Sequence, residues 1–87
     1  MNEETLLEFP CRFPIKVMGI NTPGFEALVV MIGRQHIPDL GEAAISSTPS
    51  RTGKYLSVTL TFTATSKPQI DNLYRALHDH PDVKFVL

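Results

Sequence analysis

Hydrophobic and polar residues alternate without exception over residues 55–65. The apolar set is Leu56, Val58, Leu60, Phe62 and Ala64, and the other set is Tyr55, Ser57, Thr59, Thr61, Thr63 and Thr65. An alternation of period two predicts a β-strand with one face in the core. The threonines are β-branched, as strands prefer, and their hydroxyls fit a face that meets water or a wet interface. The sequence therefore predicts a sheet with one open face.

Two other segments carry apolar residues at positions i, i+3, i+4 and i+7, which is the spacing of an amphipathic helix. These residues are Phe25, Leu28, Val29 and Ile32 in the first segment and Ile70, Leu73, Tyr74 and Leu77 in the second. Thr22 followed by Pro23 predicts an N-cap and a proline at the first helical position. Ser66 with Gln69 three residues later predicts a capping box. Both helix starts are therefore marked.

Three further stretches predict strands. Phe13, Ile15 and Val17 alternate with Pro14, Lys16 and Met18, residues 42–48 are a weaker candidate, and in residues 83–87 one face would hold Val83, Phe85 and Leu87. Because βαβ crossovers are right-handed, the order βαββαβ predicts an α+β, two-layer sandwich of ferredoxin-like type. Its four-stranded antiparallel sheet would have the order 4-1-3-2, with two helices on one face.

Length bounds the domain organisation. A chain of 87 residues has room for one domain, which we assign to residues 13–87. Residues 1–12 lack a clear period, so we expect an N-terminal segment whose Leu6, Leu7 and Phe9 pack on that domain.

Charge and hydropathy narrow the function classes. The net charge of −1, from 8 basic and 9 acidic residues, gives no field that draws the protein to nucleic acid or an anionic membrane. No apolar run is long enough to span a bilayer. The start of the chain carries Glu3 and Glu4 and lacks the pattern of a signal peptide, so we expect a cytoplasmic protein.

Candidate chemistry is sparse. Cys11 is the only cysteine, which excludes an intrachain disulfide, and its apolar neighbours favour a packing role over a nucleophile. His78 and His80 are two residues apart, so on a helix they point in different directions, unlike a zinc-binding pair. Residues 48–55 lack the first glycine and the following helix of a phosphate-binding loop. We expect no catalytic residue, no metal site and no cofactor.

The open sheet face is the surface to which the sequence assigns a partner. We expect Lys16, Met18, Thr59, Thr61 and Lys84 on it, together with Val86. A mixed apolar and polar face of this kind fits another protein or a second copy of the chain, and exposed sheet edges offer a second route by strand pairing. An RNA-binding module of the same topology would use this face too, although only one aromatic residue, Tyr55, is expected there. Simple solvation is the remaining alternative.

Several short stretches together resemble a known family. They are Leu6 to Pro10, Lys16 to Gly19, Tyr55 with Ser57 to Thr59, Ala64 with Thr65, Leu73 with Tyr74 and Leu77, and Val83 with Val86 and Leu87. In their order and spacing the chain resembles the YbeD-like family of small bacterial proteins of unknown function, whose fold is ACT-like. The resemblance spans nearly the whole chain and is weakest over residues 38–50.

The resemblance implies a regulatory role, because ACT domains bind small ligands such as amino acids, and a weak link to lipoate metabolism. ACT ligand sites use the turn between the first strand and the first helix. Here that turn implies Gly19, Asn21, Thr22 and Gly24 as ligand-binding residues, although the same residue types also suit an ordinary strand-to-helix turn.

The sequence as a whole therefore favours a non-enzymatic regulatory or adaptor domain that binds a small metabolite, a protein partner, or both. Two alternatives stay open. One is an RNA-binding module that uses the open sheet face, and the other is an accessory subunit of an enzyme complex.

Overall fold

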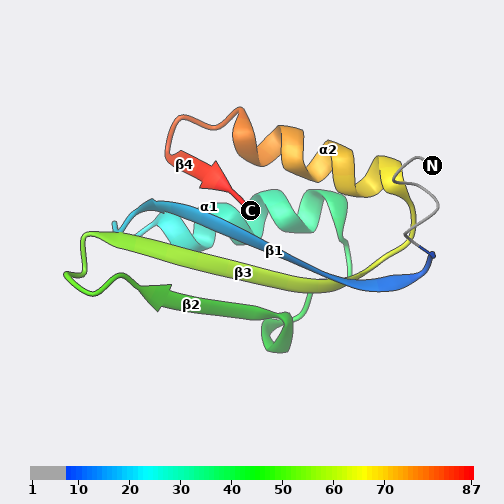
Figure 1. Cartoon of the computed structure of the whole chain (residues 1–87), viewed down its shortest axis with the longest axis horizontal. Helices are drawn as coiled ribbons and strands as arrows, with labels where there is room; N and C mark the ends of the chain where they lie inside the picture. The colour runs from blue at the N-terminus through cyan, green and yellow to red at the C-terminus, as the bar shows by residue number, and fades with distance from the viewer. Residues whose placement is uncertain (1–7) are drawn as a thin grey trace.

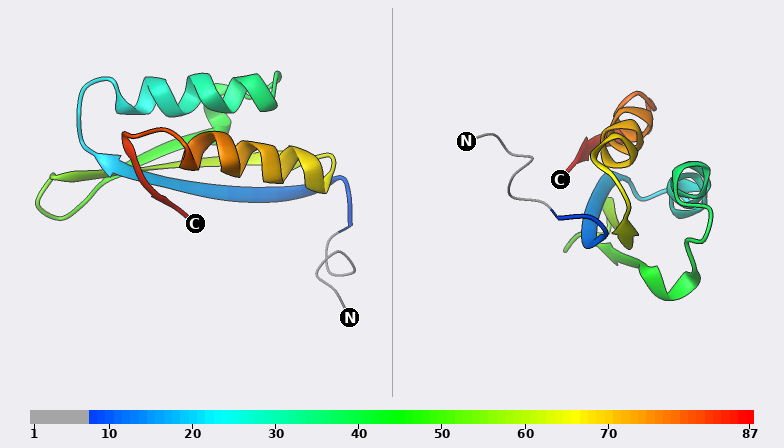
Figure 2. Two further views of the ribbon diagram at one scale, coloured as in Figure 1. Left: turned by 90° about the horizontal axis from the view of Figure 1, so that it is seen from above. Right: turned by 90° about the vertical axis from the view of Figure 1, so that its right-hand side faces the viewer.

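The computed structural model of the chain describes residues 8–87, so the expected packing of Leu6 and Leu7 lies outside the described residues. The elements are β1 (Cys11–Ile20), α1 (Phe25–His36), a 3₁₀ helix η2 (Glu42–Ala44), β2 (Ile45–Pro49), β3 (Tyr55–Ala64), α2 (Lys67–His78) and β4 (Val83–Val86) (Figure 1). The four-stranded sheet has the order β2-β3-β1-β4, which is the predicted 4-1-3-2. Both helices cover one face of the sheet (Figure 2). The predicted ferredoxin-like fold is therefore confirmed.

The core lies between the helices and the inner face of β1 and β3. These strands pair along their whole length, so that Ile15 lies opposite Leu60 and Val17 opposite Val58. All four side chains are fully buried. The helices cover them with Phe25, Val29, Ile32, Ile70, Leu73 and Leu77, which are buried as well. The apolar positions of the strand and helix patterns thus meet in one layer, as period-two and period-3.6 patterns require.

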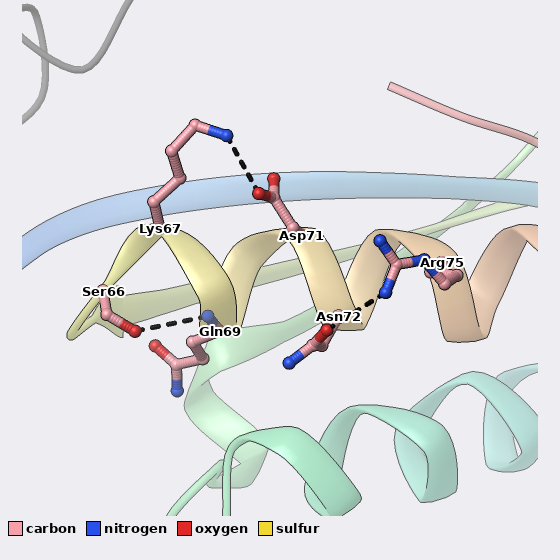
Figure 3. A network of polar contacts seen from close by, with 6 residues as sticks. All are labelled: Ser66, Lys67, Gln69, Asp71, Asn72 and Arg75. Atoms are coloured by element: carbon pink, nitrogen blue, oxygen red, sulfur yellow. Dashed lines mark hydrogen bonds and ion pairs between the residues drawn. The ribbon is translucent and has the colours of Figure 1, made fainter.

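The two helix starts differ from each other. At α2 the predicted N-cap is confirmed, because the Ser66 hydroxyl accepts a hydrogen bond from the Gln69 N–H at 3.2 Å (Figure 3). The reciprocal bond of a capping box is shifted by one residue, because the Gln69 side chain accepts from the Thr65 N–H. The Thr22 prediction is wrong, because α1 begins at Phe25 with Gly24 in the N-cap position. The backbone carbonyl of Thr22, rather than its hydroxyl, accepts a hydrogen bond from the Phe25 N–H at 3.2 Å. A turn that delivers Phe25 to the core precedes the helix.

The Gln69 side chain joins three segments. Its Oε1 accepts hydrogen bonds from the N–H and the hydroxyl of Thr65 at 2.8 and 3.2 Å, and its Nε2 donates to the His36 carbonyl at 3.0 Å. The last residue of α1 is thereby held against the first turn of α2. On the outer side of α2, Lys67 pairs with Asp71 at 2.9 Å (Figure 3), but an exposed pair of this kind contributes little to stability.

The last strand departs from its predicted pattern. Its facing pairs with β1 are Val17 with Val86, Met18 with Phe85, and Gly19 with Val83. Lys84 is therefore the extra residue of a β-bulge. The bulge lets Val83 and Val86 both face the core, while Phe85 and Leu87 turn to the open face. The predictions that Val83, Phe85 and Leu87 share one face and that Val86 lies on the open face are both wrong, because each assumes regular pairing.

Two strand boundaries also differ from the prediction. Residues 42–44 form η2, so β2 begins only at Ile45. The buried Leu40 anchors the chain ahead of η2, which then carries it to the sheet edge. β1 begins at Cys11, so Cys11 belongs to the sheet rather than to a preceding segment. Phe9 and Cys11 pack partly buried against the core.

Candidate functional site

The turn that the resemblance assigns to ligand binding lies between β1 and α1. Gly19 is buried there. A Cβ at this position would collide with the Phe25 ring and would lie 2.6 Å from the carbonyl oxygen of Asp82. The missing side chain of Gly19 therefore makes room for Phe25 and for the chain that leads into β4. The close backbone approach at Gly19 is made by the protein's own residues.

The other turn residues have different surroundings. Asn21 holds the β2–β3 hairpin, because its Nδ2 donates to the Gly53 carbonyl at 3.0 Å and its backbone N–H donates to the Lys54 carbonyl at 2.9 Å. Thr22 and Gly24 are exposed. The structure thus brings the turn against the hairpin loop at one end of the molecule, with the Asn21 amide engaged in an internal bond.

A small pocket adjoins this turn. It measures about 90 Å³ and is lined by Ile20, Thr22, Pro81, Asp82 and Lys84. This volume is well below the roughly 300 to 1,000 Å³ of ligand pockets in proteins. An amino acid would therefore extend beyond it.

Four of the five residues predicted for the partner surface share the open face. The register of β1 and β3 places Lys16 opposite Thr59 and puts Met18 and Thr61 on the same side of the sheet. Lys84 lies at the bulge and lines, together with Ile20, the small pocket beside the turn. The open face is therefore assembled largely as the sequence predicts.

The sequence reasoning missed the apolar part of this face. Ile20, Phe85 and Leu87 are 37%, 46% and 64% exposed. Phe85 lies opposite Met18, and Leu87 lies beside Lys16, with which it exchanges two backbone hydrogen bonds of 2.8 and 3.2 Å. Because paired residues share a face, these side chains gather where β1 meets β4. We call Met18, Ile20, Phe85 and Leu87 the apolar corner.

A groove of about 340 Å³ lies between α2 and β4 and is lined by Tyr74, Arg75, His78, Asp79 and Val86. Burial raises the pKa of the Tyr74 phenol above its ordinary value. Arg75 donates one hydrogen bond, from Nη1 to Asn72 Oδ1 at 3.3 Å (Figure 3). Within residues 8–87 it forms no ion pair.

A second groove, of about 410 Å³, lies between α1 and the segment that enters β2. Its lining is Pro23, Glu26, Ala27, Val30, Arg34, Glu42 and Ile45. The Arg34 guanidinium in this groove already makes one hydrogen bond within the protein, because its Nε donates to the Leu40 carbonyl at 3.1 Å.

Metal-ligating side chains do not gather in the part of the chain that the structure describes. No group of three or more His, Cys, Asp or Glu residues there is placed to hold a metal ion. None of the helices described is long and apolar enough to cross a membrane.

These features define a small ferredoxin-like α+β domain in which three of the four exposed large hydrophobic residues described lie at one corner of an open sheet face. Residues 4–87 match the family DUF493, described as proteins of unknown function. The chain is 48% identical over 87 residues to the UPF0250 protein NE1487 of Nitrosomonas europaea, with 100% of each chain covered. It is 49% identical over 84 residues to a UPF0250 protein of Janthinobacterium sp., covering 97% of this chain and 92% of the relative. The chain therefore belongs to the DUF493 family, and the resemblance to the YbeD-like proteins is confirmed.

One solved structure is similar to this chain in fold, and the similarity extends to the fold and not to function. The solution structure of protein HP0495 from H. pylori matches 93% of this chain and 85% of its own chain, with a TM-score of 0.74 and 11% sequence identity. Two chains so different in sequence share the fold because the same apolar pattern can be filled by different side chains.

Proposed function

We propose that this protein is a non-enzymatic adaptor or regulatory domain of the cytoplasm, which docks a protein partner on the open face of its sheet. The apolar corner carries the proposal. Within residues 8–87 there are four exposed large hydrophobic residues, and Ile20, Phe85 and Leu87 are three of them. Apolar side chains that gather on one surface mark interaction sites, whereas scattered ones need no explanation.

The surroundings of the corner support a protein partner. Lys16, Thr59 and Thr61 continue the face with charged and hydroxyl groups. An apolar centre with a polar rim is the usual arrangement of a protein–protein interface. Aromatic anchors near the centre of an interface carry a large share of its binding energy, which makes Phe85 the residue to test.

Co-purification with matched variants tests the proposal. The tagged protein and the variants Phe85→Lys and Met31→Lys are each used to capture partners from a bacterial lysate. Met31 is the matched control, because it is 54% exposed but lies on α1, away from the sheet. We expect one protein to be captured by the original chain and by Met31→Lys and to be lost with Phe85→Lys. Equal capture by all three forms would refute the proposal, and an enzyme as the captured protein would identify an accessory subunit.

Regulation by a small ligand is a second candidate, supported by the pocket that Thr22 and Lys84 line, which would hold one end of the ligand. A thermal-shift screen with amino acids, lipoate and related acyl compounds tests it. A ligand at 100 times its Kd adds about 2.7 kcal/mol, or roughly 10 to 20 °C, to a domain of this size. The shift should disappear in Lys84→Met. A flat screen would exclude the tested compounds.

One observation supports RNA binding as an alternative function. Phe85 joins Tyr55 on the open face, so that this face holds two aromatic rings for base stacking. The Tyr55 ring already has Lys54 Nζ 5.4 Å from its centroid. Fluorescence anisotropy of a short labelled RNA at 50 and 200 mM salt would detect the steep salt dependence that RNA binding requires.

A further inference from the structure

Within residues 8–87, the edge strand β4 carries backbone groups with no pairing partner. Leu87 faces β1, because it exchanges two backbone hydrogen bonds with Lys16. In an antiparallel ladder, successive residues face the neighbouring strand and then away from it. The N–H and C=O of Val86 therefore point outward, away from β1. Among the described strands, β4 has β1 as its single neighbour (Figure 1), so an added strand would meet a donor and an acceptor on Val86.

The helix side of this edge offers space and charge. The groove between α2 and β4 holds about 340 Å³. Arg75 lines it with one hydrogen bond made, to Asn72, so most of the five guanidinium N–H groups are available for a carboxylate. His78 adds further donor capacity, while Asp79 at the end of α2 would repel an acid placed there. The groove therefore favours an acidic side chain near Arg75.

The open side of the same edge is apolar. Phe85 and Leu87 lie on it, 46% and 64% exposed. Side chains of a strand alternate between the two faces of a sheet. A strand added beside β4 would thus place every second side chain on the apolar corner and the others in the groove. The two sides of the edge together specify an alternation of apolar and acidic residues.

The length of β4 distinguishes between possible occupants. A stable dimer interface buries about 1,200 Å² or more. Self-pairing of a four-residue strand (Val83–Val86) would align too few residues for that area, and two copies would also bring their Arg75 grooves together. A linear segment binds transiently through few backbone bonds and pockets for alternate side chains. The short edge with its flanking groove fits a linear segment.

We propose that β4 takes up an extended segment of a partner protein as a fifth strand, with acidic residues facing Arg75 in the groove and branched apolar residues facing Phe85 and Leu87. The inference rests on the proposed partner-binding function and names the chemistry of the partner. It places the contact at one sheet edge rather than over the whole open face.

Titration of the ¹⁵N-labelled protein with synthetic peptides tests the inference. The probe is the capped hexapeptide Val-Glu-Val-Glu-Val-Glu, and its matched controls are the same composition in the order Val-Val-Val-Glu-Glu-Glu and the peptide with Lys for Glu. We expect amide shifts over residues 84–87 and 74–79 with the alternating acidic peptide, and at least five-fold weaker binding of both controls. Arg75→Glu should reverse the preference between the Glu and Lys peptides.

Backbone pairing is tested without changing the protein. Two further peptides carry N-methyl groups on their odd or on their even residues. One of them should lose binding and the other should keep it, because only one set of N–H groups faces β4. Equal binding of both would overturn strand addition.

Two other outcomes would also overturn the inference. Absence of shifts at β4 and α2 with every peptide at millimolar concentration would do so, and the adaptor function would survive if capture still depended on Phe85. Shifts at the same amides that grow with protein concentration alone would identify a second copy of the chain as the occupant.

Discussion

Substitution of Gly19 by alanine is the sharpest test of how the turn between β1 and α1 is built. The added Cβ would collide with the Phe25 ring and lie 2.6 Å from the Asp82 carbonyl oxygen. Neither neighbour yields easily, because Phe25 is 2% exposed and the oxygen belongs to the backbone. Gly19→Ala should therefore destabilise the domain strongly although it adds a single carbon.

The magnitude follows from the packing. One extra carbon in a filled core typically lowers the free energy of unfolding by about 1 to 3 kcal/mol. Because the neighbours of Gly19 are rigid, we expect a loss of about 3 kcal/mol for Gly19→Ala. For a domain of this size that loss corresponds to a decrease in Tm of roughly 12 to 24 °C. Gly24→Ala is the matched control in the same turn. Gly24 has φ −97°, and a Cβ there meets nothing within 4 Å.

Calorimetry and urea unfolding of both variants measure the effect. Gly24→Ala should change the unfolding free energy by less than about 0.5 kcal/mol, since the loss of chain flexibility offsets a poorer N-cap. In Gly19→Ala, a further Phe25→Leu change should recover part of the loss, and the double-mutant cycle should give a coupling of about 0.5 kcal/mol or more. An unchanged Tm in Gly19→Ala, or a coupling of zero, would refute the packing account.

Three other predictions concern single side chains. Gln69→Ala should lower stability by about 1 to 3 kcal/mol in urea unfolding, because it removes the bonds to Thr65 and to the end of α1, while Gln35→Ala on the exposed face of α1 should be neutral. Ser47→Val should raise stability by about 1 kcal/mol, since the Ser47 hydroxyl is buried with no partner among the described residues. The control Ser46→Val, on the exposed side of the strand, should raise stability less. An equal rise in both variants would contradict this reason. Burial raises the pKa of Tyr74. The contribution of Tyr74 to the free energy of unfolding is therefore complete below the unfolded pKa of about 10 and is lost as pH rises through the folded pKa. Between pH 8 and 11, the free energy of unfolding should therefore fall more steeply for the original chain than for Tyr74→Phe.

The regular part of the fold could be predicted because its patterns depend on neighbours in sequence. The alternation over residues 55–65 predicts β3, and Ser66 with Gln69 predicts the start of α2. Thr22 carries a similar signature, but α1 begins later because the turn must first deliver Phe25 to the core. Local signatures are thus reliable where no long-range contact overrides them.

In the candidate site, too, local patterns predict some residues, whereas others depend on long-range pairing. Lys16 and Met18 could be placed on the open face from alternation alone, and Ile20 continues that alternation. Phe85 and Leu87 could not be placed, because their side depends on a bulge at Lys84 that is set by pairing with β1. A strand of alternating residues carries no local mark of a one-residue register shift, and such a shift moves every following side chain to the other face.

The Gly19 contact and the apolar corner are parts of one arrangement. The chain before β4 can approach β1 closely because Gly19 has no side chain, and the Asp82 carbonyl oxygen lies only 2.6 Å from where a Cβ would be. Val83 then enters the core opposite Gly19, and the extra residue Lys84 lets Phe85 face outward. A substitution at Gly19 should therefore displace β4 and weaken partner capture as strongly as Phe85→Lys, even where the domain stays folded. Capture that survives in a folded Gly19→Ala variant would show that the corner forms independently of this contact.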